Sequence, residues 1–465
     1  MIKALTLRRW FLVGTVLLQL LSGTHASAST CQQGTSVPVG GGRNGIEIDK
    51  AWSGATVVFD AIARGKMVYF GYYDSDRWLT VAELDPLSGV VCRSRLASKF
   101  AGWDSHNSVA LAFDGNGQLQ VAANMHDSPL VYGAAASPDS IAGMSLSLMI
   151  GRDEDKVTYP NFMNSPDGQL YFVYRSGVSG NGEWFVNARD GQTWQRTLET
   201  PIFASTWNGS PTNAYPSAFR MSADGYVHLA AVWRLAPDVA SNYAITYART
   251  RDFVHWTGHD GRPITPPLDP ANSDMIEATG EDQGLVNSAR VSVTTDGKPV
   301  VAYTRYGPDG RNSLVLASPS GDGWRRSIVA TAGHQTIIAG GGTVPNLPSF
   351  GDPVVSGGQV GSIDISFPGE PRRRVFFDTA TLDVVDAPKA GIKPVAIRPL
   401  DVSPPPGLAN VRKNARGVRV DGVPAGTAGS IIYFSQGINR DQVRKCTSSE
   451  PTACDPLPSP LIFVQ

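Results

Sequence analysis

The chain has 465 residues and a formal net charge of −1, with 40 lysines and arginines against 41 aspartates and glutamates. This balance gives no long-range attraction to nucleic acid or to an anionic membrane surface, so neither is expected as a partner. The 49 glycines, 33 prolines and 9% aromatic residues favour an all-β fold with many turns.

The N-terminal segment has the pattern of a secretory signal peptide. Basic residues precede an apolar stretch, residues 10–21, which leads to a small-residue cleavage site at Ala26-Ser27-Ala28. The apolar stretch is too short for a membrane anchor. The sequence therefore predicts a signal peptide over residues 1–28 and one catalytic domain over residues 29–465, secreted or retained in a periplasm.

Four cysteines suit two disulfides in an oxidising compartment. Cys446 and Cys454 are close enough to close a small loop near the C-terminus. Cys31 and Cys92 would then tie the N-terminal segment to the first sheet. Three pairings exist in principle, and this one rests on spacing. A zinc site is the alternative, but no cysteine stands beside a histidine in the sequence.

Two histidine-bearing segments, residues 103–108 and 124–127, flank a predicted β-hairpin. Its two apolar runs are separated by Asp114-Gly115, and an Asp-Gly turn between apolar runs is a strong hairpin signal. The hairpin would carry His106 and His126 to the same end of a sheet. Imidazole takes up and releases protons near neutral pH, so this pair is the first candidate for proton transfer.

The following hairpins share a second pattern, a tyrosine at the start of one strand and an arginine at the end of its partner. Tyr159 and Arg175 occupy these positions, and Tyr215 and Arg234 occupy the analogous positions in the next hairpin. The planar guanidinium of arginine binds carboxylates in a bidentate way, and tyrosine can transfer a proton. The further candidates for substrate binding are Asn107, Tyr303, Arg305 and His334.

A turn followed by an apolar strand recurs along the chain, roughly every 50 to 70 residues. A propeller blade of four strands needs about 40 to 50 residues, and loops can supply the rest. Six visible units and one at the chain closure predict an all-β, seven-bladed β-propeller. A pair of β-sandwiches is the alternative. The turns are Asp114-Gly115, Asp167-Gly168, Asp224-Gly225 and Asp296-Gly297, with Arg64-Gly65 before them and Gly357-Gly358 after them.

The candidate residues favour elimination over hydrolysis. Glycoside hydrolysis needs two suitably placed acidic residues, and no clear pair is visible. Asp104 and Asp127 are the nearest carboxylates, and each adjoins a histidine, so orienting an imidazole is the simpler role. Histidine, tyrosine and arginine suit β-elimination from a uronic acid, in which arginine neutralises the carboxylate while the other groups move protons.

Several of these segments resemble a known family. Asp104-Ser-His-Asn107, Asn124-Met-His-Asp127, Thr158-Tyr-Pro160 and Tyr174-Arg-Ser-Gly-Val-Ser-Gly-Asn-Gly182 are similar to motifs of the BNR-4 type seven-bladed propellers. That group includes ulvan lyases and L-rhamnose-α-1,4-D-glucuronate lyases. The likeness spans roughly residues 50 to 340. Some members bind calcium or zinc structurally, so the resemblance leaves room for a structural Ca²⁺, while the chemistry needs no cofactor. It implies catalytic roles for His106, His126, Tyr159 and Arg175, and substrate binding by Tyr215 and Arg234.

The resulting hypothesis is a secreted, monomeric lyase that cleaves an acidic polysaccharide or oligosaccharide at a rhamnose–glucuronate linkage. His106 or Tyr159 would be the base and the other the acid, with Arg175 and His126 holding the carboxylate. His106 is the preferred base because imidazole is partly neutral near pH 7, unless Arg175 lowers the pKa of Tyr159. The alternatives are a rhamnosidase-like hydrolase on the same propeller and a non-catalytic carbohydrate-binding propeller.

Overall fold

The computed structural model is nearly all-β and describes residues 29–341, 344, 346–355, 358–387 and 401–465. In that part of the chain the 3-10 helix η1 (Val239–Ser241) is the one helical element. No helix within these residues has the length and apolar character needed to cross a membrane. The predicted signal peptide, residues 1–28, lies outside the described residues.

The repeating unit is an antiparallel sheet whose strands follow one another along the chain. Five sheets correspond to one unit each. Their strands are β8 (Ala110–Phe113), β9 (Leu119–Ala122), β10 (Tyr132–Ala134) and β11 (Ser145–Ser147); β12 (Val157–Asn164), β13 (Leu170–Val178), β14 (Asn181–Asp190) and β15 (Thr193–Arg196); β18 (Asn213–Pro216), β19 (Val227–Arg234), β20 (Asn242–Thr250), β21 (Trp256–Thr257), β22 (Pro263–Ile264) and β23 (Asp274–Ala278); β24 (Arg290–Val293), β25 (Pro299–Tyr306), β26 (Asn312–Ser320) and β27 (Gly323–Thr331); β28 (Ser349–Phe350), β29 (Val360–Ser366), β30 (Arg373–Asp378) and β31 (Val384–Val385).

Both ends of the chain meet in a ten-stranded sheet. Its order is β1-β7-β6-β5-β4-β32-β33-β34-β3-β2. The C-terminal strand β34 pairs with the N-terminal β3, so one unit is built from residues at opposite ends of the sequence. A separate short hairpin joins β16 (Thr206–Trp207) to β17 (Ser210–Pro211). The strands of the large sheet are β1 (Thr30–Gln33), β2 (Thr35–Pro38), β3 (Asn44–Ala51), β4 (Asp60–Arg64), β5 (Met67–Tyr73), β6 (Trp78–Leu84), β7 (Val90–Lys99), β32 (Val411–Val420), β33 (Val423–Gln436) and β34 (Ser459–Val464).

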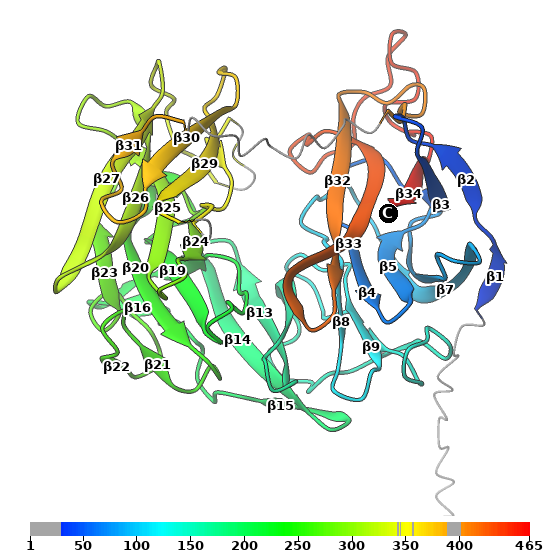
Figure 1. The fold of residues 1–465 in the computed structure, drawn as a ribbon, viewed down its shortest axis with the longest axis horizontal. Coiled ribbons are helices and arrows are strands. Elements are labelled where there is room, and N and C mark those ends of the chain that lie inside the picture. Colours follow the sequence, from blue (N-terminus) through cyan, green and yellow to red (C-terminus); the bar gives the residue numbers. More distant parts are fainter. Residues whose placement is uncertain (1–28, 342–343, 345, 356–357, 388–400) are drawn as a thin grey trace, which may run out of the picture.

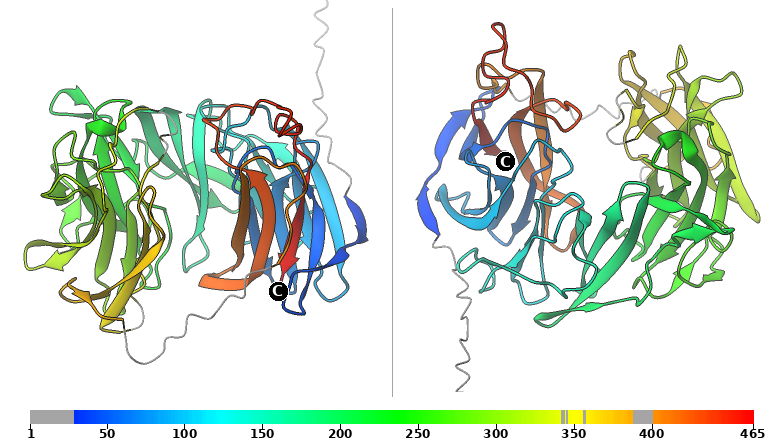
Figure 2. Two further views of the ribbon diagram at one scale, coloured as in Figure 1. Left: turned by 90° about the horizontal axis from the view of Figure 1, so that it is seen from above. Right: turned by 180° about the vertical axis from the view of Figure 1, so that it is seen from behind.

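The units are arranged in sequence order around an arc, from β4–β7 through β12–β15 to β28–β31 (Figure 1), and the views in Figure 2 show the same arc from above and from behind. The predicted all-β propeller architecture is confirmed. The large sheet divides at the parallel contact of β32 with β4, which gives seven units among the described strands, five separate and two joined. Because those two units share one hydrogen-bonded sheet, the count of seven blades remains a prediction.

The apolar core lies between neighbouring units. One cluster contains Val173 of β13 and Trp233 of β19, and another contains Val232 of β19 and Val301 of β25. Successive residues Val232 and Trp233 therefore face opposite neighbours, as the alternation of side chains along a strand requires. The sheets β12–β15 and β18–β23 each contribute to two such clusters, so their positions in the arc are fixed by two packing surfaces.

Glycines with left-handed backbone close the first hairpin of several units. Gly168, Gly225 and Gly297 have φ angles of 87°, 77° and 83°, which a residue with a Cβ rarely adopts. In the β8–β9 hairpin the corresponding residue is Gly117, with φ 78°, whose N–H donates to the carbonyl of Asp114. The turn predicted to begin at Asp114-Gly115 is therefore confirmed, and Gly117 is its left-handed residue.

The disulfide pairing expected from spacing is confirmed. Cys31 and Cys92 join β1 to β7 as directly paired residues of the sheet. Cys446 and Cys454 close the loop that precedes β34.

A buried ion pair connects the second and third units. Arg189 Nε of β14 donates to Asp114 Oδ2 over 2.6 Å, and the two side chains are only 6% and 2% exposed. The guanidinium also reaches the hydroxyl of Tyr132, which accepts a hydrogen bond from Trp194 Nε1. Asp114 thus balances a cation that would otherwise be buried without a counter-ion.

Candidate active site

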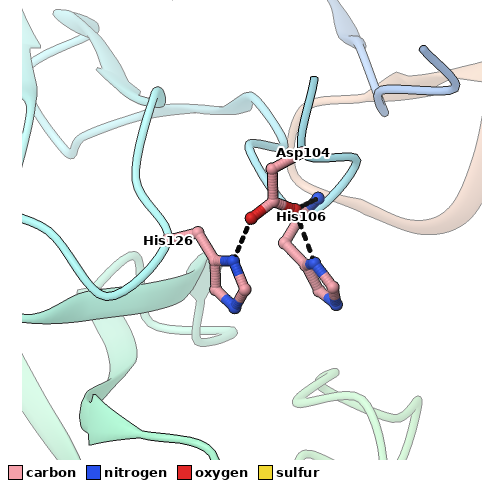
Figure 3. Close-up of side chains that lie close together, drawn as sticks. All are labelled: Asp104, His106 and His126. Atoms are coloured by element: carbon pink, nitrogen blue, oxygen red, sulfur yellow. Dashed lines mark hydrogen bonds and ion pairs between the residues drawn. The ribbon is translucent and has the colours of Figure 1, made fainter. Parts of the chain in front are cut away.

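His106 and His126 lie side by side at one end of the β8–β9 hairpin, as the sequence predicts. His106 precedes β8 and His126 follows β9. Their rings stack with centroids 4.2 Å apart and an interplanar angle of 23°, and Figure 3 shows them hanging in parallel from a common partner. That partner is Asp104, which supplies one carboxylate oxygen to each ring.

Asp104 holds both imidazoles through the same ring atom. His106 Nδ1 lies 2.7 Å from Asp104 Oδ1, and His126 Nδ1 is hydrogen-bonded to Asp104 Oδ2. Burial opposes ionisation of this carboxyl, but the hydrogen bonds from the two histidines outweigh it and hold the pKa of Asp104 below its ordinary value. An ionised carboxylate only accepts hydrogen bonds, so both Nδ1 atoms carry protons and both Nε2 atoms are left for a ligand (Figure 3).

The backbone around His126 is held in an uncommon conformation. Asn124 and Asp127 have φ angles of 61° and 51°, in the left-handed region. Met125 between them is fully buried, and the N–H of Asp127 donates to Thr158 Oγ1 of the next unit over 2.9 Å. Tertiary contacts thus fix the loop in the shape that turns the imidazole toward Asp104.

Tyr159 belongs to the third unit and extends the histidine pair. The register of β12 shifts between Thr158 and Asn161, and Tyr159 at this irregularity has a φ of 59°. Its ring lies edge-on to His106, with centroids 6.1 Å apart, and stacks parallel to Trp184 at 5.9 Å. Burial raises the pKa of the Tyr159 hydroxyl, and the nearby guanidinium of Arg175 offsets only part of that effect.

Two arginines are buried beside this group without an acidic partner. Arg175 and Arg234 are each 4% exposed, and no carboxylate among the described residues forms an ion pair with either. Arg175 lies 5.1 Å from the ring centre of Tyr159; its one hydrogen bond, to Gly177 O, is 3.4 Å long, and its Nε has no partner. Arg234 donates only to the backbone carbonyls of Ala236 and Asp238. Buried cations of this kind form a ready anion site.

The tyrosine–arginine pattern read from the sequence is geometrically repeated. Arg234 lies 5.2 Å from the ring centre of Tyr215, as Arg175 lies over Tyr159. The Tyr215 hydroxyl accepts a hydrogen bond from Gly180 N, in the turn that follows Arg175. The two pairs therefore come from neighbouring units and are connected to each other.

Of the four further predicted residues, Asn107 adjoins His106 and the other three have their contacts elsewhere. Asn107 is buried and its amide donates to Asp104 O, which supports the loop. Tyr303 is fully buried and donates to Glu277, and its role in substrate binding stays a prediction. Side chains on that face of β25 point into the core between units. Arg305 shares Glu277 over 3.0 Å, and His334, 58% exposed, lies 3.9 Å from Glu370 on a different loop.

A pocket of about 370 Å³ opens beside Tyr159 and Tyr215. Sequence reasoning did not include Trp184 in the site, although it is the cross-strand neighbour of Arg175 and could have been found by pairing the two strands. The lining residues are Ser108, Tyr159, Pro160, Asn161, Trp184, Tyr215, Pro216, Ser217, Ala218, Phe219 and Asn287.

Among the described residues, two groups of side chains are close enough to share a metal ion. One is Asp104 with His106 and His126, and the other is His259 with Asp260 and Asp274. Calcium takes six to eight oxygen ligands, and neither group offers such a set. The structural Ca²⁺ that the resemblance allowed therefore stays a prediction, and neither group is assigned to it.

Fold and site together define a propeller-type β protein whose titratable groups converge on one end of adjacent units. The sequence matches the model of the BNR repeat-containing family (BNR_4) over residues 67–332, which is more than half of the chain. The chain therefore belongs to this family, and the resemblance seen in its motifs is confirmed. No curated protein matches the chain by sequence.

Solved polysaccharide lyases have a similar fold. A PL25 ulvan lyase bound to -[GlcA(1-4)Rha3S]- aligns with a TM-score of 0.57 at 10% identity, covering 86% of this chain and 93% of that one. Polysaccharide lyase Uly1 aligns with a TM-score of 0.55 at 13% identity, covering 91% and 93%. At this level of identity the likeness establishes the fold.

Substituting Asp104→Asn tests the shared carboxylate. The pKa of Asp104 is lower in the folded protein than in the unfolded chain, so the ionised carboxylate stabilises the fold. This stabilisation is complete above the unfolded-state pKa of about 3.9, and it is lost as the pH falls through the folded-state pKa. At pH 7 we expect the free energy of unfolding of the variant to be about 1–3 kcal/mol lower than that of the wild type. Below about pH 4 this difference between the two proteins should become smaller. Urea unfolding of both proteins at pH 7 and pH 3 measures this.

The matched control is Asp127→Asn, which makes the same chemical change beside His126. Asp127 is exposed and its backbone conformation suits asparagine equally well. Its stability should change little at either pH. Equal losses in the two variants would contradict a special role for Asp104.

Proposed function

We propose that the protein is a secreted polysaccharide lyase that cleaves a glucuronate-containing glycan, at a rhamnose–glucuronate linkage, by β-elimination. The observation that carries the proposal is the pair of buried arginines without counter-ions, Arg175 and Arg234, next to a histidine pair clamped by Asp104. The solved ulvan lyase with the same fold is bound to a glucuronate–rhamnose repeat, which supports this substrate class. Export, and action as a monomer, remain part of the proposal.

The uronate carboxylate would bind to Arg175, assisted by His126. A guanidinium with unused donors accepts a carboxylate in a bidentate way, and neutralising that carboxylate makes the C5 proton of the sugar more acidic. Two cationic rings stacked 4.2 Å apart would repel one another. We therefore give the two rings different roles, with His126 assisting the binding of the carboxylate and His106 acting on the substrate proton.

His106 would be the base and Tyr159 the acid. His106 Nε2 is unprotonated in the neutral ring, because Nδ1 is committed to Asp104. The raised pKa of Tyr159 keeps its hydroxyl protonated, which suits a donor and not a base. This supports the assignment of His106 as base and Tyr159 as acid, since burial outweighs the effect of Arg175 on the pKa of Tyr159.

The proposed step balances within the site. His106 Nε2 takes the C5 proton, the C5–H electron pair forms a C4–C5 double bond, and the C4–O4 bond breaks. The departing O4 oxygen takes the proton of Tyr159. The products are a 4,5-unsaturated uronate and a sugar with a new reducing end. Solvent returns the proton from His106 to Tyr159 before the next turnover.

The direct test is ultraviolet absorbance during incubation with glucuronate polymers, including ulvan, gum arabic and bacterial rhamnose–glucuronate exopolysaccharides. We expect a rising absorbance from the conjugated double bond with at least one polymer. New reducing ends without that absorbance would establish a hydrolase instead. Binding to a polymer with neither signal would establish a carbohydrate-binding propeller.

Tyr159→Phe removes the proposed acid and keeps the ring that packs on Trp184. We expect a loss of about 10²–10⁴-fold in kcat, the range typical of general acid–base groups. In the wild type the alkaline limb of the pH–rate profile should lie above about pH 10, because the pKa of Tyr159 is raised from the ordinary tyrosine value. Steady-state rates between pH 6 and 11 measure both effects.

Tyr215→Phe is the control, because Tyr215 occupies the same position in the next unit without a ring contact to His106. It should raise KM more than it lowers kcat. If both variants lose kcat equally, Tyr159 is not the acid.

Arg175→Met removes a buried cation that has no acidic partner in the protein. Replacing such a charge with an apolar side chain is neutral or stabilising, so the free energy of unfolding should not fall. Turnover should fall by about 10²–10³-fold, because the substrate carboxylate loses its partner. Urea unfolding and kcat/KM, measured on the same preparation, separate the two effects.

Arg189→Met is the matched control. Its guanidinium is equally buried but pairs with Asp114, so removing it leaves an unpaired carboxylate and should cost about 3–5 kcal/mol. Comparable destabilisation by both substitutions would mean that Arg175 has a structural role.

A further inference from the structure

The pocket beside Tyr159 differs in chemistry from the charged group next to it. Among the described residues that line it, none carries a charge at neutral pH. We propose that this pocket holds the sugar adjacent to the uronate, that this sugar is neutral with an apolar face, and that a sulfated sugar is rejected there. The inference rests on the proposed function and adds the sulfation preference of the substrate.

One wall of the pocket is apolar. Trp184 donates its indole N–H to Ala214 O over 3.0 Å, so it offers only its ring surface. Tyr159 lies parallel to it, at an interplanar angle of 8°, and Phe219 continues the wall. Aromatic surfaces of this kind pack against the C–H face of a sugar ring. A deoxygenated carbon, such as the methyl group of a 6-deoxyhexose, adds apolar area without a hydroxyl that needs a partner.

The polar groups of the pocket are neutral amides and hydroxyls. Asn161 uses its amide N–H on the carbonyl of Phe219 over 3.0 Å, which leaves its side-chain oxygen as an acceptor. Asn287 and Ser108 come from the units on either side and can both donate and accept. This set matches sugar hydroxyls, which are donors and acceptors at once. It does not match a sulfate, which only accepts hydrogen bonds and carries a full negative charge.

In the proposed reaction the arginines next to the pocket already bind the uronate carboxylate. Arg175 and Arg234 lie over the rings of Tyr159 and Tyr215 and would hold the uronate carboxylate. A sulfate in the pocket would be partly removed from water without a cation of its own, which is strongly unfavourable. It would also compete with the carboxylate for the same arginines. Both effects act against a sulfated neighbour.

The experiment compares one rhamnose–glucuronate polymer in its sulfated form and after chemical desulfation, at equal uronate concentration. The rate of absorbance increase is measured for each. We expect kcat/KM to be about tenfold or more higher for the desulfated polymer. Equal rates, or faster cleavage of the sulfated polymer, would overturn the inference while leaving β-elimination intact.

A cation placed in the pocket should reverse the preference. Asn287→Arg adds a guanidinium to the lining, and we expect it to shift the ratio of the two rates toward the sulfated polymer by about tenfold. Asn287→Gln makes a neutral change at the same position and should keep the wild-type ratio, whatever its absolute rate. If the two variants give the same ratio, the neutral lining does not set the preference.

If neither polymer is cleaved, the proposed function fails, and binding still decides this inference. Saturation-transfer NMR is recorded on the wild-type protein with methyl α-L-rhamnoside and with its 3-O-sulfate. Transfer to the ring protons of the neutral glycoside alone supports a neutral-sugar pocket. Equal transfer to both, or transfer to the sulfate alone, overturns it.

Discussion

The Asp104 carboxylate is the interaction on which the site depends. It accepts a hydrogen bond from the Nδ1 atom of both His106 and His126, and so fixes two rings with one residue. Without this carboxylate, no hydrogen bond would fix the same orientation and tautomer in the two imidazoles, whose ring centres are 4.2 Å apart. Because both Nε2 atoms then face the same way, one ring can bind an anion while the other accepts a proton. The remaining groups only have to be placed around that pair.

The propeller geometry places them. The strands β12 and β13 are antiparallel, so the start of β12 lies beside the end of β13. Tyr159 and Arg175 therefore meet at the same edge of the sheet, although they are distant in sequence. The next unit repeats the pair as Tyr215 and Arg234. Packing between units fixes the spacing of these edges, because the two sheets that carry the pairs bury both faces. A cation buried at such an edge costs stability unless something pairs with it, and no carboxylate among the described residues forms an ion pair with Arg175 or Arg234.

The fold, the histidine hairpin and the tyrosine–arginine pattern could be predicted because each is a local signal: a turn, an alternation, or a residue at a strand end. The sequence does not tell which of the two glycines in the β8–β9 turn is left-handed, and the structure assigns that conformation to Gly117. The burial of Tyr303 depends on which unit packs against β25, and no local pattern carries that information. The left-handed conformation of Tyr159 is likewise imposed by tertiary contacts, since a tyrosine has no intrinsic preference for it.

Charge is divided unevenly across the site, and under the proposed function this asymmetry would give the substrate a direction. The arginines and the histidine pair can stabilise an anion, whereas the pocket beyond Tyr159 offers only neutral groups and ring surfaces. A proposed substrate of alternating uronate and neutral sugar would fit in one register, because the opposite register would bring a carboxylate into a pocket without cations. Tyr159 borders both regions, so in this register the oxygen joining the two sugars would lie next to its hydroxyl. The distribution of charge that selects the register would therefore also select which bond is broken.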